Sequence, residues 1–406
     1  MMTMLTPLSG EALHGDSHQQ RRRALLGSLC LFLSAIEYLI PKPLPFMRIG
    51  LANLPLLLAL DIFGAKDFFL LVLLKVLGQG IIGGTFFSYV FLFSLAGTCS
   101  SAVLMHVARK LAGKKRLGFA GLGCLGAMAS NAVQLVLARY FIFGPALRYL
   151  IPPFLASGLI SGIALGLACE YFCRRSRWYA RLSGGGTEAE PVGPIPPQPR
   201  PGLSRKTHYT DFLNADELFI AGLLMALIFL FSPSLPDRAA QFFFFYSLAL
   251  LSGKKINPFV TALIMGGIVF VHLLAPYGKV LLAIGPLRVT RGSLLAGLEK
   301  AITLEGLLML SQTCIRSSLK LPGAVGSLLG ESLRLLELMR ERKGLISKGH
   351  IIGGIDRLML ELETADIDAA ANATPRRTKR SVKNIILLIT IVLITAALSQ
   401  INQPRP

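Results

Sequence analysis

The stretch PKPLPFMRIGLANLPLLLALDIFG, residues Pro41–Gly64, decides how the first half of this chain folds. It follows one apolar segment and leads directly into another. Proline lacks a backbone donor and fixes φ, so the three prolines that open the stretch predict an extended, kinked elbow at the membrane surface. Gly50, Asn53 and Pro55 then interrupt an otherwise continuous apolar run. Such interruptions at membrane depth usually face protein or a cavity, and we expect that orientation here.

The composition of the chain is that of a polytopic integral membrane protein. The sequence has 406 residues, of which 53% are hydrophobic and 16% charged, and its mean hydropathy is +0.59. The formal net charge of +20 would indicate nucleic-acid binding in a soluble protein. Here Lys and Arg gather in short loops between apolar segments, a pattern that sets membrane topology and contacts anionic lipid. We therefore expect a multi-pass protein of the inner (cytoplasmic) membrane, with membrane lipid and no nucleic acid as partners.

Basic clusters also predict the topology of residues 21–181. Residues 1–20 are polar and expected to be disordered, and the triple Arg that follows precedes an apolar segment at 24–40. The alternative, a signal peptide, lacks a small-residue cleavage site. Further apolar segments at 50–63, 68–82, 86–108, 117–138 and 150–172 make six helices with both ends in the cytoplasm. The segments at 50–63 and 68–82 are short for a span of about 20 residues, so they either cross with a tilt or form a re-entrant hairpin.

A change of composition divides the chain in two. Residues 182–216 are rich in Gly and Pro, as in a flexible to semi-rigid linker. A second membrane domain is expected at 217–345, and it ends in an amphipathic helix over Ser327–Gly344 that lies on the inner surface. A cytoplasmic segment, 346–383, leads to a last transmembrane helix within 384–406.

Polar side chains inside membrane segments are the candidate binding residues, because burying an ionisable group in lipid is costly. Lys75 and Gln79 lie four residues apart on one helix face, which indicates a substrate site. Asn131 and Gln134 form a similar pair, for which an interhelical hydrogen bond is the simpler account.

Two further polar residues flank the proline-rich elbow. Glu37 either belongs to the same site or is an interfacial carboxylate solvated by headgroups. Asn53 suits either a helix cap or a contact with a ligand. Both are kept among the candidate substrate-binding residues.

Other motifs concern packing and the absence of cofactor chemistry. Gly158, Gly162 and Gly166 form a GxxxGxxxG pattern that lets a second helix backbone approach closely. The six cysteines contain no CxxC and predict packed thiols rather than a disulfide framework or a metal site. No nucleotide-binding loop, Ser/His/Asp triad or zinc motif is present. The sequence therefore predicts no catalytic residue, metal or cofactor.

The runs IEYLIP (Ile36–Pro41), MRIGLANLPLLLALDIFG (Met47–Gly64) and LLKVLGQGIIGGTFFSYVFLFSLAGTCSSAVLM (Leu73–Met105) resemble the Gx transporter family, also named heptaprenyl diphosphate synthase component I. That family is similar in fold to the substrate-binding S components of energy-coupling-factor importers. More loosely, Gly285–Arg316 resembles their T component. The resemblance implies an all-α membrane protein in which a six-helix S-component-like bundle is fused to a smaller T-component-like module.

The function implied by this resemblance is transport. A small hydrophobic or amphipathic substrate, such as a vitamin, a flavin or an isoprenoid or quinone precursor, would bind inside the helical bundle. T components dock ATPase subunits through Ala-Arg-Gly motifs, which are absent after Ser327. The absence of these motifs argues against docking of ATPase subunits. The protein partners that the resemblance implies are ATPase subunits or, for a scaffold in electron transfer, flavin-carrying membrane proteins.

Two alternatives belong to other classes of function. The family's second name implies a membrane component of isoprenoid or menaquinone synthesis. Prenyl synthases that elongate chains hold Mg²⁺ with DDxxD motifs, which this sequence lacks, and Asp356, Asp366 and Asp368 do not have that spacing. We therefore do not expect an enzyme. The other alternative is a scaffold for flavin-based extracytoplasmic electron transfer.

Overall fold

The computed structural model describes residues 10–38, 50–183, 213–254, 256–285, 287–316, 319, 322–342, 344, 351–364 and 382–400. The proline-rich elbow before Gly50, most of the predicted linker and the pair Asp366 and Asp368 lie outside these ranges.

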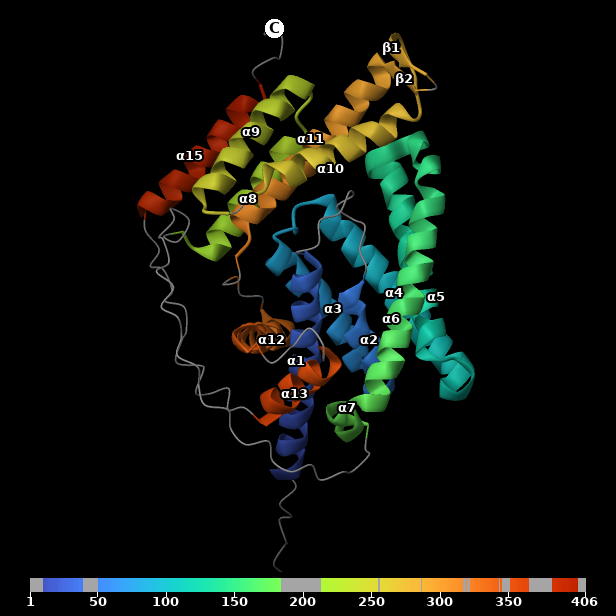
Figure 1. Cartoon of the computed structure of the whole chain (residues 1–406). Helices are drawn as coiled ribbons and strands as arrows, with labels where there is room; N and C mark the ends of the chain where they lie inside the picture. The colour runs from blue at the N-terminus through green and yellow to red at the C-terminus, as the bar shows by residue number, and fades with distance from the viewer. Residues whose placement is uncertain are drawn as a thin grey trace, which may run out of the picture.

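Helices that alternate in direction build the first half of the chain (Figure 1). They are α1 (Gly10–Tyr38), the short turn η1 (Leu51–Asn53) with α2 (Leu54–Ile62), α3 (Ala65–Gly83), α4 (Tyr89–Arg116), α5 (Phe119–Ala138) and α6 (Ile151–Arg175). Two tight turns, η2 (Arg139–Phe143) and η3 (Gly144–Tyr149), link α5 to α6, and α7 (Arg177–Leu182) follows. Helices α2 and α6 both start with Pro in the first turn, where its missing donor costs no helical hydrogen bond.

Charged residues meet at the end of this bundle where α1 begins. Asp67, at the start of α3, binds Arg23 at 2.8 Å, and Asp61, at the end of α2, binds Arg109 at 3.0 Å. The basic stretches of α1 and α4 thus lie at the same end of the molecule. Helix α7, which follows the basic end of α6, also lies at this end (Figure 1).

Helix α1 starts earlier than the sequence indicates. Residues 10–20, expected to be disordered, belong to the helix. The side-chain amide of Gln19 donates to Asp67 at 2.6 Å, and that of Gln20 donates to Glu331 at 3.2 Å. Gln19 and Gln20 therefore each contact another helix of the molecule.

Three helical segments in the described part of the chain are long and apolar enough to cross a membrane: α4, α5 with the turns up to Tyr149, and α6. Large apolar side chains such as Val136 and Ile160 are exposed on α5 and α6, as expected where helices face lipid. These segments indicate a membrane protein. Helix α2 has nine residues and a length of about 14 Å, so by itself it does not cross a hydrocarbon core of about 30 Å.

A second group of helices lies above α1–α3 in Figure 1, with axes oblique to those of α4–α6. It contains α8 (Ala215–Leu230), α9 (Leu235–Leu251), α10 (Pro258–Leu273), α11 (Arg291–Cys314) and α15 (Val382–Leu398). The two groups meet at the turn between α3 and α4. There the backbone N–H of Phe87 donates to Oγ of Ser311 at 3.2 Å, and Phe87 packs against Phe219, with ring centroids 5.2 Å apart.

The fold is not entirely helical. Strands β1 (Val280–Ile284) and β2 (Leu287–Thr290) form an antiparallel hairpin between α10 and α11. Gly285, with φ of +57°, supplies the positive φ that few other residues adopt easily in a tight turn. The described residues are otherwise predominantly helical, as expected, and the sequence analysis did not identify this hairpin.

The amphipathic helix does not pack as a part of the second domain. Helix α12 (Gly323–Glu341) buries Leu335 and Met339 in the same core as α1. Oγ of Ser332 donates to the backbone carbonyl of Ala24 at 3.2 Å. The polar helix α13 (Ile351–Thr364) also packs on α1, where Arg21 donates to the carbonyl of Leu362 at 2.8 Å. Removal of α12 would therefore expose the core face of α1.

A buried carboxylate holds α13 against the end of the first bundle. Asp356 accepts from Oγ of Ser176 at 2.5 Å, from N–H of Arg177 at 3.2 Å and from N–H of Trp178 at 3.0 Å. These backbone donors belong to the free N-terminus of α7, which favours a negative charge.

Asp356→Ala is expected to lower the melting temperature of the purified protein. Loss of a cap costs about 0.5–2 kcal/mol, and a buried donor left without a partner adds about 1–3 kcal/mol. Asp356→Asn keeps one acceptor oxygen and should cost less. The adjacent residue Arg357 is exposed, so Arg357→Ala is the matched control and should melt like wild type. Equal melting of all four proteins would contradict the role of Asp356.

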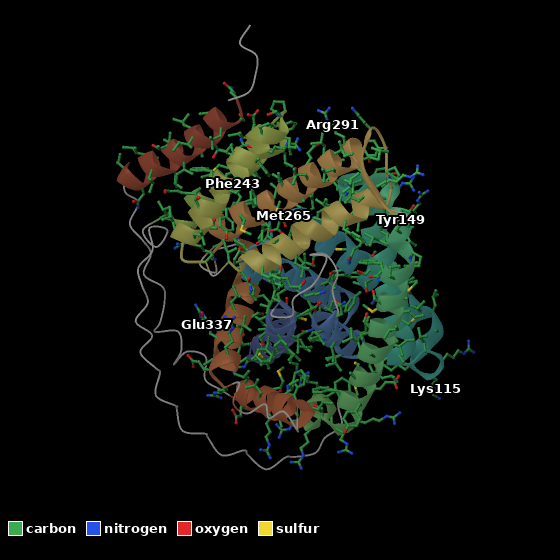
Figure 2. The ribbon with its side chains drawn as sticks, turned by 45° about the horizontal axis from the view of Figure 1, so that its top comes forward. Lys115, Tyr149, Phe243, Met265, Arg291 and Glu337 are labelled. Atoms are coloured by element: carbon green, nitrogen blue, oxygen red, sulfur yellow. The ribbon has the colours of Figure 1, made fainter. Side chains whose placement is uncertain are left out.

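The basic end of the bundle is expected to lie in the cytoplasm. Gly113 has φ of +70°, which strains a cysteine probe, so the neighbouring Lys115 is the better position. Lys115 and Ser183 are both exposed, and Lys115 lies at the edge of the molecule (Figure 2). In a background without native cysteines, Lys115→Cys and Ser183→Cys should react with an impermeant maleimide only after the cells are opened. Labelling of Lys115→Cys on intact cells would reverse the orientation.

Candidate functional site

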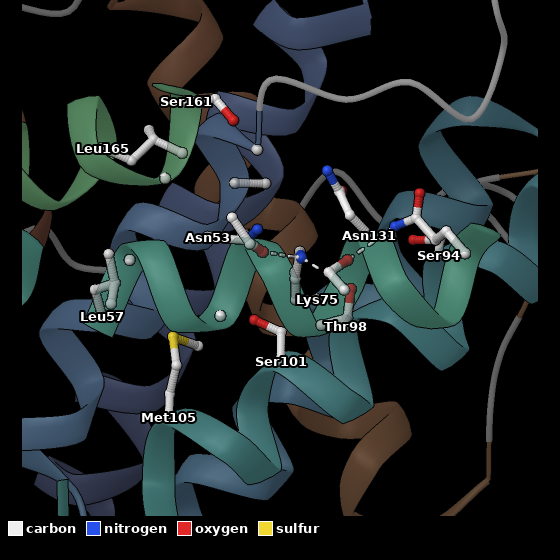
Figure 3. A pocket seen from close by; sticks show the side chains of 18 of the residues that line it. Asn53, Leu57, Lys75, Ser94, Thr98, Ser101, Met105, Asn131, Ser161 and Leu165 are labelled. Carbon is white, nitrogen blue, oxygen red and sulfur yellow. Dashed lines mark hydrogen bonds between the residues drawn. The ribbon is translucent and has the colours of Figure 1, made fainter. Parts of the chain in front are cut away.

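A pocket lies inside the first bundle, and α1 through α6 all contribute to its wall (Figure 3). Its volume is about 60 Å³, which is room for a few waters at about 10–15 Å³ each. All six candidate binding residues line it: Glu37, Asn53, Lys75, Gln79, Asn131 and Gln134.

Lys75 lies in the middle of α3 and is only 3% exposed. Its ammonium group donates to Oδ1 of Asn53 at 2.5 Å and to Oγ1 of Thr98 at 3.1 Å, as Figure 3 shows. Both acceptors are neutral oxygen atoms, and these two bonds position the ammonium in the pocket wall.

The chain after the proline-rich elbow forms one side of the pocket. Gly50 has φ of +87°, and its N–H donates to Oε1 of Glu37 at 3.1 Å. Glu37 is 4% exposed and therefore is not a headgroup-solvated carboxylate. Asn53 precedes α2 but makes no side-chain capping bond. Of its two predicted roles, the cap is wrong, and its side chain instead contacts Lys75.

The three remaining candidates, Gln79, Asn131 and Gln134, form hydrogen bonds with partners in different places. Oε1 of Gln79, one turn after Lys75, accepts from Oγ of Ser94 at 3.3 Å. Asn131 on α5 donates to the carbonyl of Phe154 on α6 at 2.9 Å, which is the interhelical bond expected for it. Gln134 donates to Ser130 at 2.8 Å, and this bond lies within one helix rather than between two.

The sequence reading missed the polar face of α4. Ser94, Thr98, Ser101 and Met105 all line the pocket. They recur at intervals of four, three and four residues, the spacing of one helical face. This stripe of hydroxyl groups within an apolar helix was visible in the sequence and is a sign of an inward-facing polar surface.

Glycines bring α5 and α6 into direct backbone contact beside the pocket. A Cβ atom added to Gly162 would lie 2.6 Å from the carbonyl oxygen of Gly123, and one added to Gly166 would lie 2.4 Å from Cα of Ala120. At Gly158 it would lie against the side-chain amide of Asn131. The three glycines of the GxxxGxxxG pattern therefore all face α5, and Gly162 also lines the pocket.

The wall of this pocket offers one ammonium, one carboxylate and several amides and hydroxyls. Among the residues that the structure describes, no group of three or more His, Cys, Asp or Glu side chains is placed to hold a metal ion. Asp356, considered above for a metal motif, lies at the start of α7 as a helix cap.

Two family models match separate parts of the chain. Residues 218–317 match a domain of unknown function (DUF8519). Residues 26–172 match the model described as heptaprenyl diphosphate synthase component I. No curated protein and no solved structure matches the chain. The second of these matches spans α1 through most of α6 and thus every residue that lines the pocket. Over residues 26–172 the chain is similar to the heptaprenyl diphosphate synthase component I family.

Proposed function

We propose that this membrane protein binds a small molecule in the pocket of its first bundle as the recognition step of membrane transport. The observation that supports the proposal is the convergence of buried polar groups from α1, η1, α3, α4 and α5 around Lys75. Buried ionisable groups in membrane proteins are costly and mark binding sites and transport pathways. Under this proposal the first bundle acts like an S component and the second helical group like a T component.

The position of the pocket supports transport better than a scaffold role. A scaffold recruits partners through its surface, whereas Lys75 and Gln79 are each 3% exposed. The hydroxyl stripe of α4 and the amides of α5 face this pocket from helices long enough to cross a membrane. The arrangement thus favours a solute that is surrounded by helices.

A substitution that fills the pocket tests the proposal. A Cβ at Gly126 would lie 2.7 Å from Oγ of Ser101 and from Sδ of Met105, the mobile ends of side chains in the pocket wall. Gly126→Leu should therefore fill part of the pocket, displace these side-chain ends and remove a bound small molecule. The bound molecule is measured by denaturing the purified protein and analysing the extract by mass spectrometry.

The matched control is a second glycine of α5. At Gly121 an added Cβ meets only the side chain of Leu117, and Gly121 does not line the pocket. We expect Gly121→Leu to retain the molecule found in wild type and Gly126→Leu to lose it, with similar melting curves for both. Equal retention by the two folded variants would place the bound molecule elsewhere and contradict the proposal.

A further inference from the structure

An isolated buried carboxyl group lies on α11, outside the pocket of the first bundle. Glu305 is 1% exposed, and neither Oε1 nor Oε2 has a hydrogen-bond partner among the residues that the structure describes. One turn away on either side, Ala301 and Met309 are buried in apolar clusters. An ionised carboxylate in such surroundings costs far more free energy than the neutral acid. Glu305 is therefore expected to be protonated in this arrangement of the helices.

The face of α11 that carries Glu305 is turned toward the first bundle. Ala301 belongs to a cluster that also contains Phe93 of α4. Gln312 lies seven residues after Glu305 and thus on the same helix face. A Cβ atom added to Gly84, in the turn between α3 and α4, would lie 2.8 Å from Cα of Gln312. Since Glu305 lies between these two contacts, it is buried where the first bundle meets the second helical group.

Charged groups on the neighbouring helices are paired elsewhere. Arg238 of α9 donates to Glu299 at 2.8 Å and to Oγ1 of Thr303 at 3.2 Å. At about 3.6 residues per turn, Thr303 and Glu305 lie on nearly opposite sides of α11. Nδ1 of His272 on α10 lies 2.9 Å from a carbonyl oxygen of its own helix.

The other titratable groups on or around α11 do not satisfy this carboxyl either. None of them is hydrogen-bonded to Glu305. They are Tyr89 of α4, Asp216 and Glu217 of α8, Asp237 of α9, Arg288 of β2, and Arg291 and Lys300 of α11. The burial of Glu305 is thus compensated by no opposite charge that the structure describes.

We propose that Glu305 is a proton-binding site, neutral while α11 packs against the first bundle and ionised when the two helical groups separate and water enters between them. On separation the carboxyl O–H bond breaks and the proton passes to water; on closure one proton is taken up. Buried ionisable groups in membrane proteins often serve such proton steps. A hard metal cation is a poorer occupant, because it takes about six or more oxygen ligands. The inference goes beyond the proposed function and requires no ligand in the pocket.

Infrared spectroscopy detects the proton directly. Wild type, Glu305→Gln and Glu299→Gln are purified in a maltoside detergent, which has no carbonyl group of its own. Their spectra are recorded at neutral pH in water and in D₂O. Glu299 pairs with Arg238, so Glu299→Gln is the matched control that removes an ionised carboxylate from the same helix.

We expect the spectrum of wild type minus Glu305→Gln to contain the C=O band of one protonated carboxyl group. Wild type minus Glu299→Gln should contain only carboxylate bands. In D₂O the protonated band should move to lower frequency, because the proton exchanges whenever the helical groups separate. Absence of the band would show that Glu305 is ionised and overturn the proposal. A band that stays unshifted in D₂O until the protein unfolds would overturn the link to separation.

The melting temperature as a function of pH provides a second readout. A glutamate in an unfolded chain ionises near pH 4.3, about its ordinary value, so the folded protein binds one more proton above that pH and loses stability as the pH rises. One proton changes the unfolding constant about tenfold per pH unit. From about pH 6 to about pH 8, wild type should therefore lose more melting temperature than Glu305→Gln, and Glu299→Gln should keep the wild-type slope.

Parallel curves for wild type and Glu305→Gln would contradict the proton site. If Glu305→Gln does not fold, Glu305→Asp retains a carboxyl group at this position. Its spectrum should then show a protonated band at an altered frequency, and an unaltered wild-type band in that variant would assign the proton to another residue and overturn the proposal.

Discussion

Lys75→Met is expected to weaken binding of the molecule that copurifies with wild type by about 100-fold. A hydrogen bond to a charged group contributes about 1.5–3 kcal/mol, and each 1.4 kcal/mol is about tenfold in affinity. Methionine is close to lysine in length and lacks the charge, so the pocket keeps its shape and loses the ammonium. Equilibrium titration of ligand-free protein in nanodiscs measures the effect.

Two further variants make this result specific. Thr98→Val removes one of the two oxygen atoms that position the ammonium but keeps the charge, so the affinity should fall by only a few-fold. Lys115→Met removes an exposed lysine and should bind like wild type. Lys75→Met leaves Oδ1 of Asn53 without this donor, so its melting temperature should also fall slightly. Wild-type affinity in a folded Lys75→Met protein would mean that the ammonium is only structural.

Gly162→Leu should have the largest effect on stability. An added Cβ at this position would lie 2.6 Å from the carbonyl oxygen of Gly123 and 2.8 Å from Cβ of Ala127. Backbone cannot move aside as a side chain can, so α5 and α6 must separate. Overpacking costs about 1–3 kcal/mol, and at about 2–4 °C per kcal/mol the upper end predicts a drop of roughly 6–12 °C. The melting temperature in detergent is the measurement.

The control for this variant lies two residues away on the same helix. Ala164 is exposed, so Ala164→Leu places the same side chain on the opposite face and should leave the melting temperature unchanged. A Gly162→Leu protein that melts like Ala164→Leu would show that α5 does not contact this face of α6. Because Gly162 also lines the pocket, the loss of stability should be accompanied by loss of the bound molecule.

Much of the candidate site was predictable because burial of polar groups in a membrane is expensive. Lys75 and Gln79 attract attention on this ground alone, and their spacing of four residues places them on one helix face. The same argument selects Glu37 and Asn131. The structure brings all four to one pocket. The spacing of residues along the chain does not show which side chains bind one another. Thr98, which binds Lys75, would have been found only by applying the same burial argument to the hydroxyl groups of α4.

Contacts between distant segments account for most of what the sequence did not predict. The amphipathic pattern of α12 indicated a helix with one apolar face, but not that α1 would cover it. Asp356 lies 180 residues from Ser176, and no local pattern relates a carboxylate to a helix start so far away. The hairpin between α10 and α11 has strands of only five and four residues, and the sequence analysis treated this stretch only as the start of the T-component-like region.

The central claim is that one small molecule binds in the pocket through Lys75, and native mass spectrometry of the intact protein tests it most directly. Released gently from detergent, wild type and Lys115→Met should each show a single discrete mass adduct per chain, and folded Lys75→Met should show none. An adduct of the same mass and occupancy on Lys75→Met would contradict the account.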